Sequence, residues 1–354
     1  MDLVTLLRKE SIALRRNLGP AVVLLVLLPG AIAGGTVVFE QTIPQDVPVG
    51  IVAEDDATEN DVEIVRAGLA SFATAAEYET TDEATQALQR EQIYLVIRVP
   101  GELMEPEANA TVTVVSDHTF VPFEEPVNET AGIAESELDR SFPADVTVDH
   151  EQVGEERTLS EFLVPTGLFA FVVLYALGYL PYQLRSERRV LDRLQTESRL
   201  EFVVASKLLF YGALLVIPTT IVAAVSAWFG FDVAALSPAT LLAVGLTFGY
   251  LAAIGLAVCF ALGLEKIALM VNLGIALAVF GLSSLVYPVG FFSTVQGTIS
   301  RAIPTHYSAI VTRSTMLRDA PITLYADYLG WLVAATIGSI VLLELSLVVY
   351  RWRR

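Results

Sequence analysis

The sequence has one cysteine and few histidines, and both shortages exclude kinds of site. Cys259 is the only cysteine among 354 residues, so no disulfide can form within the chain and no thiolate-rich metal site can exist. The three histidines, His118, His150 and His306, are far apart in the sequence. Isolated histidines are more often packed or surface residues than metal ligands, so we expect no metal site.

Two motifs of nucleotide-binding and hydrolytic proteins are also missing. The chain has no Gly-x-x-x-x-Gly-Lys-Ser/Thr loop, so it cannot bind nucleotide phosphates in that way. It has no Gly-x-Ser-x-Gly elbow, and no serine, histidine and aspartate that the predicted topology would bring together. We therefore expect a chain that is not an enzyme and holds no cofactor of its own.

Basic residues are scarce where acidic residues are dense. Between Glu40 and Glu161 there are 29 acidic and 5 basic residues, hence a net charge of −24, whereas the remaining 11 acidic and 17 basic residues sum to +6. This balance excludes a basic surface for nucleic acid in the acidic interval. Dense carboxylates with so little lysine resemble a salt-adapted, haloarchaeal protein, and an ordinary acidic extracellular domain is the alternative. The lysines are Lys9, Lys207 and Lys266.

Apolar runs long enough to cross a bilayer flank this interval, since a spanning helix needs about 20 apolar residues. The first, 20–39, resembles a signal peptide because Ala31-Ile32-Ala33 precedes Gly34, but it continues to Phe39 and we interpret it as a retained span. An amphipathic segment at 1–19 precedes it and is suited to the membrane interface. Five further predicted spans follow, at 162–184, 204–228, 238–262, 267–289 and 325–350.

The interval 40–160 predicts a small α/β domain, because short β-rich runs alternate with helical ones. The fold class is therefore an α-helical polytopic membrane protein with six transmembrane helices, and an extracellular α/β domain inserted between the first and second spans. Within that domain the predicted strands are 47–53, 93–99, 111–115 and 146–148, and the predicted helices are 59–72, 82–90 and 124–140.

Charge orients the predicted spans. With the N-terminus in the cytoplasm, that side receives the basic segments 1–19 and 185–203 and the tail 351–354. The other side receives the acidic interval, with the glycosylation sequons at Asn109 and Asn128. We expect a multi-pass protein of the cell membrane with both termini in the cytoplasm and residues 40–160 outside.

The segment 185–203 is the most distinctive cytoplasmic stretch. An apolar stripe runs along a short predicted helix, with charged residues on its other faces. Such a segment is either an amphipathic connector that lies on the membrane or a helix that docks in a groove of a partner. The residues expected to take part in docking are Glu187, Arg188, Val190, Leu191, Arg193, Leu194 and Glu201.

This segment carries a resemblance to the permease subunits of ABC-2 type ABC transporters, the membrane half of these machines. Members have a Glu-rich, Leu-rich connector between the second and third spans, although Arg189-Val190 stands here where a Gly-Thr pair is common. The resemblance extends over essentially the whole chain, and its large-loop branch has a similar extracytoplasmic domain. The matching positions are Glu187, Leu191, Leu194, Glu201 and Lys207, the start at Arg16-Asn17 and Leu28-Pro29, the stretches 47–55 and 94–100, and the Pro304-containing segment 303–307.

The resemblance implies partners and a mechanism. ATP and Mg would be bound by a separate ABC ATPase subunit, the permease would pair with a second permease chain as a homodimer or heterodimer, and 187–201 would be the coupling helix. The charge-poor spans favour an apolar or amphipathic cargo. The alternatives are a non-transporting membrane anchor that displays an extracellular sensor or binding domain, and a membrane-embedded enzyme. Five spans after the domain are more than an anchor needs.

Two further groups are candidates for the transport path. Tyr175, Tyr179 and Tyr182 share one face of the second predicted span, and Glu344 is a carboxylate within the last. Helix packing or an interfacial position accounts for them equally well, and lining of a translocation path is the alternative. The segment 290–324 predicts re-entrant or interfacial helices at the outer face, with a candidate outer gate at Pro304, His306 and Tyr307.

Overall fold

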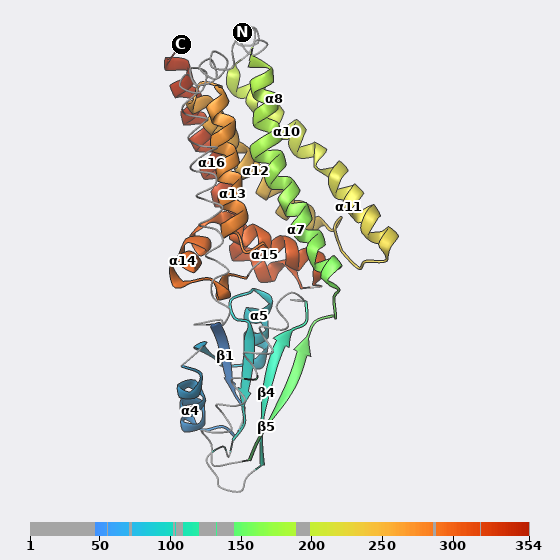
Figure 1. Cartoon of the computed structure of the whole chain (residues 1–354), viewed down its shortest axis with the longest axis vertical. Helices are drawn as coiled ribbons and strands as arrows, with labels where there is room; N and C mark the ends of the chain where they lie inside the picture. The colour runs from blue at the N-terminus through green and yellow to red at the C-terminus, as the bar shows by residue number, and fades with distance from the viewer. Residues whose placement is uncertain are drawn as a thin grey trace, which may run out of the picture.

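The computed structural model of the chain is elongated, with a helical bundle at one end and a five-stranded sheet at the other (Figure 1). Residues 1–19, the predicted span 20–39 and, except for residue 132, the predicted helix 124–140 lie outside the described residues. The structure describes residues 47–54, 56–70, 73–101, 103, 109–119, 132, 145–188, 199–285, 288–318 and 320–353.

The sheet domain has the strand order β2-β1-β3-β4-β5. β1 is parallel to both β2 and β3, β3 and β4 are antiparallel, and β4 and β5 are parallel. The connection through α4 leads from β1 to β2, and the connection through α5 leads back past β1 to β3, so right-handed crossovers put the two helices on opposite faces. The bounds are β1 Val47–Ala53, α4 Glu59–Leu69, β2 Ala73–Tyr78, α5 Thr81–Gln89, β3 Leu95–Val99, β4 Asn109–Asp117 and β5 Asp145–Val153.

Burial follows this arrangement. The β1 side chains of Val49 and Ile51 share one core with Val65 of α4, while Val52 shares a second core with Leu88 of α5. Both helices start at a threonine cap: Thr58 forms a capping box on α4, and a second threonine caps α5. The partly parallel sheet is confirmed, and so is the strand predicted at 47–53. β2 was not predicted, and β5 extends well past 146–148.

Four helical segments in the described ranges are long and apolar enough to cross a membrane. The predicted span 267–289 is instead a 17-residue helix, α13, that ends at Leu282 and would reach only about 26 Å at 1.5 Å per residue. Ser284 follows it with a positive φ of 49°, which stops the helix. The four segments are Leu159–Ser186 (α7 Leu159–Leu174, η4 Tyr175–Tyr179, α8 Leu180–Ser186), Leu200–Phe229 (α10 Leu200–Leu214, α11 Val216–Phe229), α12 Pro238–Ala261, and Ile322–Trp352 (η6 Ile322–Tyr325, α16 Ala326–Trp352).

Between α13 and the last helix the chain forms short helices at the boundary with the sheet domain. The 3-10 turn η5 (Val289–Phe291) and α14 (Thr294–Ala302) lead into α15 (Pro304–Leu317), which lies across the sheet end of the bundle (Figure 1). α15 packs on α7, α12 and α16, and nearly all of its residues are buried although many are polar. A buried polar helix therefore separates the membrane bundle from the sheet domain.

Candidate functional site

The end of the bundle away from the sheet is held together by ion pairs beside the predicted docking segment. Glu187 caps the C-terminus of α8, and its carboxylate lies 2.5 Å from the ammonium of Lys207 on α10. Arg188 pairs at 3.1 Å with Glu265, the N-cap of α13. These pairs join the helices before and after the docking segment. Val190, Leu191, Arg193 and Leu194 lie outside the described residues.

Glu201 extends the same polar surface to the last helix. It lies in the first turn of α10, and its carboxylate is 2.6 Å from the guanidinium of Arg351 at the end of α16. Arg353 donates a hydrogen bond of 2.7 Å to the carbonyl of Ala261, the last residue of α12. Exposed pairs contribute at most about 1 kcal/mol each, so their main effect is to fix how five helix ends lie relative to one another.

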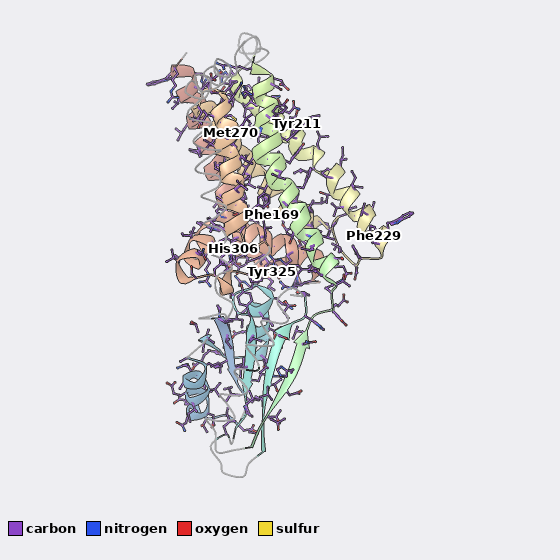
Figure 2. All side chains as sticks on the ribbon, in the orientation of Figure 1. Phe169, Tyr211, Phe229, Met270, His306 and Tyr325 are labelled. Atoms are coloured by element: carbon purple, nitrogen blue, oxygen red, sulfur yellow. The ribbon has the colours of Figure 1, made fainter. Side chains whose placement is uncertain are left out.

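Tyr175 is the centre of an aromatic cluster inside the bundle. Its ring stacks on Phe171 and on Tyr179, with centroids 5.5 Å apart in both cases. It also contacts Tyr211 of α10 at 6.2 Å and Phe248 of α12 at 5.7 Å. Two of the three predicted tyrosines are thus brought together with rings from two other helices. Tyr211 lies within the bundle, on the side away from the sheet (Figure 2).

The other two residues of the predicted path are not part of this cluster. Tyr182 is 55% exposed and takes part in none of the ring contacts among the described residues. Glu344 is exposed on α16, and none of the described polar or ring contacts joins it to the tyrosines. The structure therefore separates Glu344 and Tyr182 from Tyr175 and Tyr179.

The cluster sits on a π-helical turn, Tyr175–Tyr179, inside the second predicted span. The turn closes on the carbonyl of Tyr175 from five residues later, and Pro181 just beyond it cannot donate the next backbone hydrogen bond. α12 packs closely against the turn at Gly255, where an added Cβ would lie 3.1 Å from the carbonyl of Ala176. Single π turns inside helices are frequent at functional sites, which favours a role in the transport path.

At the sheet end, the predicted gate segment is hydrogen-bonded to the end of α13. Ser283 donates to Thr305 at 2.6 Å, and Ser284 lies 2.8 Å from Nδ1 of His306. Pro304 is the first residue of α15, where its missing N–H leaves no bond unmade. Figure 2 shows His306 at the end of the bundle that faces the sheet. The end of α13 and the start of α15 therefore form one joint.

His306 and Tyr307 in this joint differ in environment. Burial, and then the nearby cations Arg301 and Arg313, lowers the pKa of His306 to about 3, so its imidazole is neutral near pH 7. Tyr307 is half-buried, donates to the carbonyl of Arg301 at 2.8 Å, and packs its ring on Tyr328 at 4.9 Å. The gate residues are thus fixed in a closed, hydrogen-bonded arrangement.

Sequence reasoning missed the polar junction between the sheet domain and the bundle. Glu91 follows the cap of α5 with a φ of 56°, and the two hydrogen bonds of a Schellman motif close the turn. This conformation costs a non-glycine residue roughly 1–2 kcal/mol. The Glu91 carboxylate lies between the guanidinium groups of Arg313 at 3.4 Å and Arg318 at 3.7 Å. All three side chains are nearly completely buried.

Arg318 is the more extensively bonded of the two arginines. It pairs with Asp117 of β4 at 2.6 Å, and it donates to the carbonyl of Gln89 at 2.7 Å and to the Thr119 hydroxyl at 3.1 Å. Its partners therefore come from α5, from the following turn and from the end of β4. The one signal in the sequence was the presence of three arginines, Arg301, Arg313 and Arg318, in outer segments that otherwise hold almost no cations.

Other contacts across the junction involve the first turn of α16. Arg90 pairs with Asp327 and stacks on the ring of Tyr328, with its guanidinium carbon 4.8 Å from the ring centroid. The hydroxyl of Tyr325 donates to the carbonyl of Gln89 at 3.1 Å. Tyr325 lies beside the sheet in Figure 2. Polar contacts thus tie the α5–β3 turn to both α15 and α16.

The sheet domain also has a hollow of about 680 Å³ at the carboxyl end of β1. Thr58 of the α4 cap, Arg66 and Tyr78 are among its lining residues. In open α/β sheets, ligands bind outside the carboxyl ends of strands where the strand order reverses, and β1 lies at such a reversal here. Of the two predicted glycosylation positions, Asn109 is the first residue of β4, and Asn128 lies outside the described residues.

Comparison with known families assigns the chain as a whole. A family model described as "ABC-2 family transporter protein" matches residues 21–345, which include both the sheet domain and nearly all of the helices. No curated protein and no solved structure is significantly similar to the chain.

Proposed function

The chain belongs to the ABC-2 family of transporter proteins, and we propose that it is the permease subunit of an ATP-driven exporter whose ATPase is a separate chain. Membership in the family and several apolar helices make it a multi-pass membrane protein. The observation that carries the proposal is the ion-paired end of the bundle, where Glu187, Lys207 and Arg351 connect the helices on both sides of the predicted docking segment.

In this proposal the ion-paired end faces the cytoplasm and the sheet domain lies outside the cell. Arg185, Arg188, Lys207, Lys266 and Arg351 gather around that end, in agreement with the excess of cations on the cytoplasmic side of membrane proteins. The sheet domain keeps its acidic surface at the opposite end (Figure 1). ATP binding would close the ATPase pair, and the 187–201 segment would transmit that movement to α8 and α10.

The helix Leu200–Phe229 is the proposed contact surface for lipid and for a second permease chain. Only 11% of it is buried, against 61% of α12, and α11 leans away from the bundle (Figure 1). Phe229, at its tip, lies far from the other labelled residues (Figure 2). The aromatic cluster around Tyr175 lies beside this helix and supports a path for an apolar or amphipathic cargo.

The docking segment provides the test. Leu191→Ala with Leu194→Ala removes two apolar anchors from the predicted helix, and truncating such anchors usually removes most of the affinity for a groove. With the ATPase co-expressed, we expect the double variant to insert normally but to lose ATPase co-purification and cargo-stimulated ATP hydrolysis. The matched control is Leu209→Ala with Leu242→Ala, two exposed leucines of the spans. Full ATPase association of the docking variant would contradict the coupling role.

A second candidate function is a membrane anchor that displays an external ligand-binding domain. The hollow at the carboxyl end of β1 favours it, since ligands bind at this position in open α/β sheets. The same co-purification separates the two functions, because an anchor needs no ATPase. Failure of the unmodified chain to bind any co-expressed ABC ATPase would favour the anchor.

A further inference from the structure

Glu91 occupies a position in which glycine would serve the backbone better. The Gln92 N–H donates to the carbonyl of Ala87 and the Glu91 N–H to that of Leu88, which is the Schellman pattern, and the residue with positive φ in this pattern is usually glycine. A strained non-glycine residue is a reason to look for a role of its side chain. The turn alone does not explain a glutamate here.

The Glu91 carboxylate is held by charge and not by hydrogen bonds. Neither of its oxygens accepts a hydrogen bond from the residues that the structure describes, while the guanidinium groups of Arg313 and Arg318 lie 3.4 Å and 3.7 Å away. Removing one partner of a buried ion pair leaves an uncompensated buried charge, which is strongly unfavourable. Arg313 therefore depends on an anion that only the sheet domain supplies among its described ion pairs.

Arg313 connects this anion to the gate. Its guanidinium donates to the carbonyl of Ser284 at 2.7 Å and lies 5.2 Å from the ring centroid of Phe162 at the start of α7. Ser284 in turn bonds His306 through its hydroxyl. One side chain of α15 thus contacts the sheet domain, the end of α13 and the second predicted span.

We propose that Glu91 is a positioning residue through which the sheet domain holds the outer gate closed. While Glu91 lies between the two arginines, Arg313 keeps the end of α13 joined to α15. When the sheet domain moves away from α15, Arg313 loses its anion, the charged groups become hydrated, and the joint can separate to release cargo. This inference rests on the proposed export function, and it assigns the sheet domain an active part in that function.

The accessibility of α15 tests the proposal without any ATPase. Ser308 is completely buried and faces Tyr250 of α12 at 3.3 Å, so Ser308→Cys in a Cys259→Ala background reports on separation of α15 from the bundle. We expect slow labelling by an impermeant maleimide when Glu91 is present. Glu91→Gln should raise the labelling rate roughly ten-fold or more, because Arg313 loses its anion. The control Glu83→Gln removes an exposed carboxylate of the same helix and should change nothing.

A glycine variant separates the electrostatic role from a structural one. Glu91→Gly relieves the backbone strain and keeps the turn, so a purely structural role predicts wild-type labelling. Our proposal predicts that Glu91→Gly labels as fast as Glu91→Gln. Labelling of both variants at the wild-type rate would overturn the proposal.

A reversible cross-link provides a second test that does not depend on how the Glu91 variants fold. The ring of Tyr94 lies where a Cβ on Gly290 would be, so Tyr94→Cys with Gly290→Cys places two cysteines across the junction. The oxidised protein should lose transport and regain it on reduction, and full transport in the oxidised state would overturn the proposal. If labelling depends on Glu91 but no ATPase associates with the chain, the export function fails and the gate control stands. The reverse pattern rejects the gate control alone.

Discussion

The hydroxyl of Tyr94 accepts a hydrogen bond of 3.1 Å from the backbone N–H of Gly290 and so joins the sheet domain to the loop after α13. The contact is close, because an added Cβ on Gly290 would lie 2.1 Å from the tyrosine ring. Tyr94 is buried, and burial followed by the neighbouring Glu91 raises the pKa of its phenol, so the hydroxyl stays protonated. This pair is where the sheet domain approaches the membrane helices most tightly at a glycine.

Gly290→Ala should loosen this docking. The methyl group has to displace the Tyr94 ring, and overpacking of this kind costs typically about 1–3 kcal/mol. We expect a lower thermal unfolding midpoint for the purified full chain in lipid. Gly297→Ala is the matched control, since its added Cβ meets only the carbonyl of Val289 at 3.7 Å. Equal midpoints for the two variants would show that the Tyr94 contact does not limit packing.

The stability of the gate should depend on pH through His306. Its pKa is lowered from 6.5 to about 3 in the fold, so below pH 6.5 the unfolded chain binds a proton that the folded chain does not. The contribution of neutral His306 is therefore present above about pH 6.5 and is lost as the pH falls towards 3. His306→Gln removes this titration. Unfolding midpoints recorded over this window should fall more steeply for the wild type, and parallel curves would contradict the prediction.

Tyr175 should matter more than Tyr182 for transport. Tyr175→Ala removes ring contacts to three helical segments and should cost about 2 kcal/mol, less than the roughly 3–5 kcal/mol of a fully buried aromatic ring. Tyr175→Phe keeps the ring and loses only a hydrogen bond of 3.3 Å to the carbonyl of Tyr211, so it should act like the wild type. Tyr182→Ala is the exposed control. ATPase stimulation by a set of amphipathic dyes measures the effect, and equal losses in both alanine variants would argue against a path at Tyr175.

Salt should stabilise the whole chain. The interval 40–161 has a net charge of −24, and its self-repulsion is little screened in dilute buffer, where the Debye length is roughly 30 Å at 0.01 M and about 3 Å at 1 M. The thermal midpoint in lipid should therefore rise with KCl from millimolar to molar concentration. A midpoint that does not change with salt would remove the argument for a salt-adapted protein.

The elements that the sequence predicts well are those fixed by local pattern. β1 follows from the alternation of Val47, Val49 and Ile51, which are all buried, and the apolar runs locate the long helices. β2 was missed because Ala73–Tyr78 is mostly alanine with few side chains to bury, so its place at the sheet edge depends on pairing with β1. The short α13 was over-extended because the apolar run continues after the helix turns at Ser284.

The site was predictable only in its parts. The docking segment and the tyrosines stand out by composition and spacing, and the structure brings Tyr175 and Tyr179 together with rings that sequence spacing cannot reach. The junction could not be predicted, because Glu91 meets Arg313 and Arg318 only after several spans have folded between them. A glutamate after a helix looks like an ordinary solvated residue until its αL conformation is seen.

The π turn at Tyr175–Tyr179 sets the rotational phase of everything that follows it in the same span. An α-helix advances about 100° per residue, so a one-residue deletion in the turn would restore regular α-helix and rotate α8 by that angle about its axis. Glu187 would then no longer point at Lys207, although no contact at the deletion itself need be lost. The wide turn thus acts as a phase adjustment between the aromatic cluster and the ion-paired end, and an insertion or deletion there is expected to be far less tolerated than a substitution.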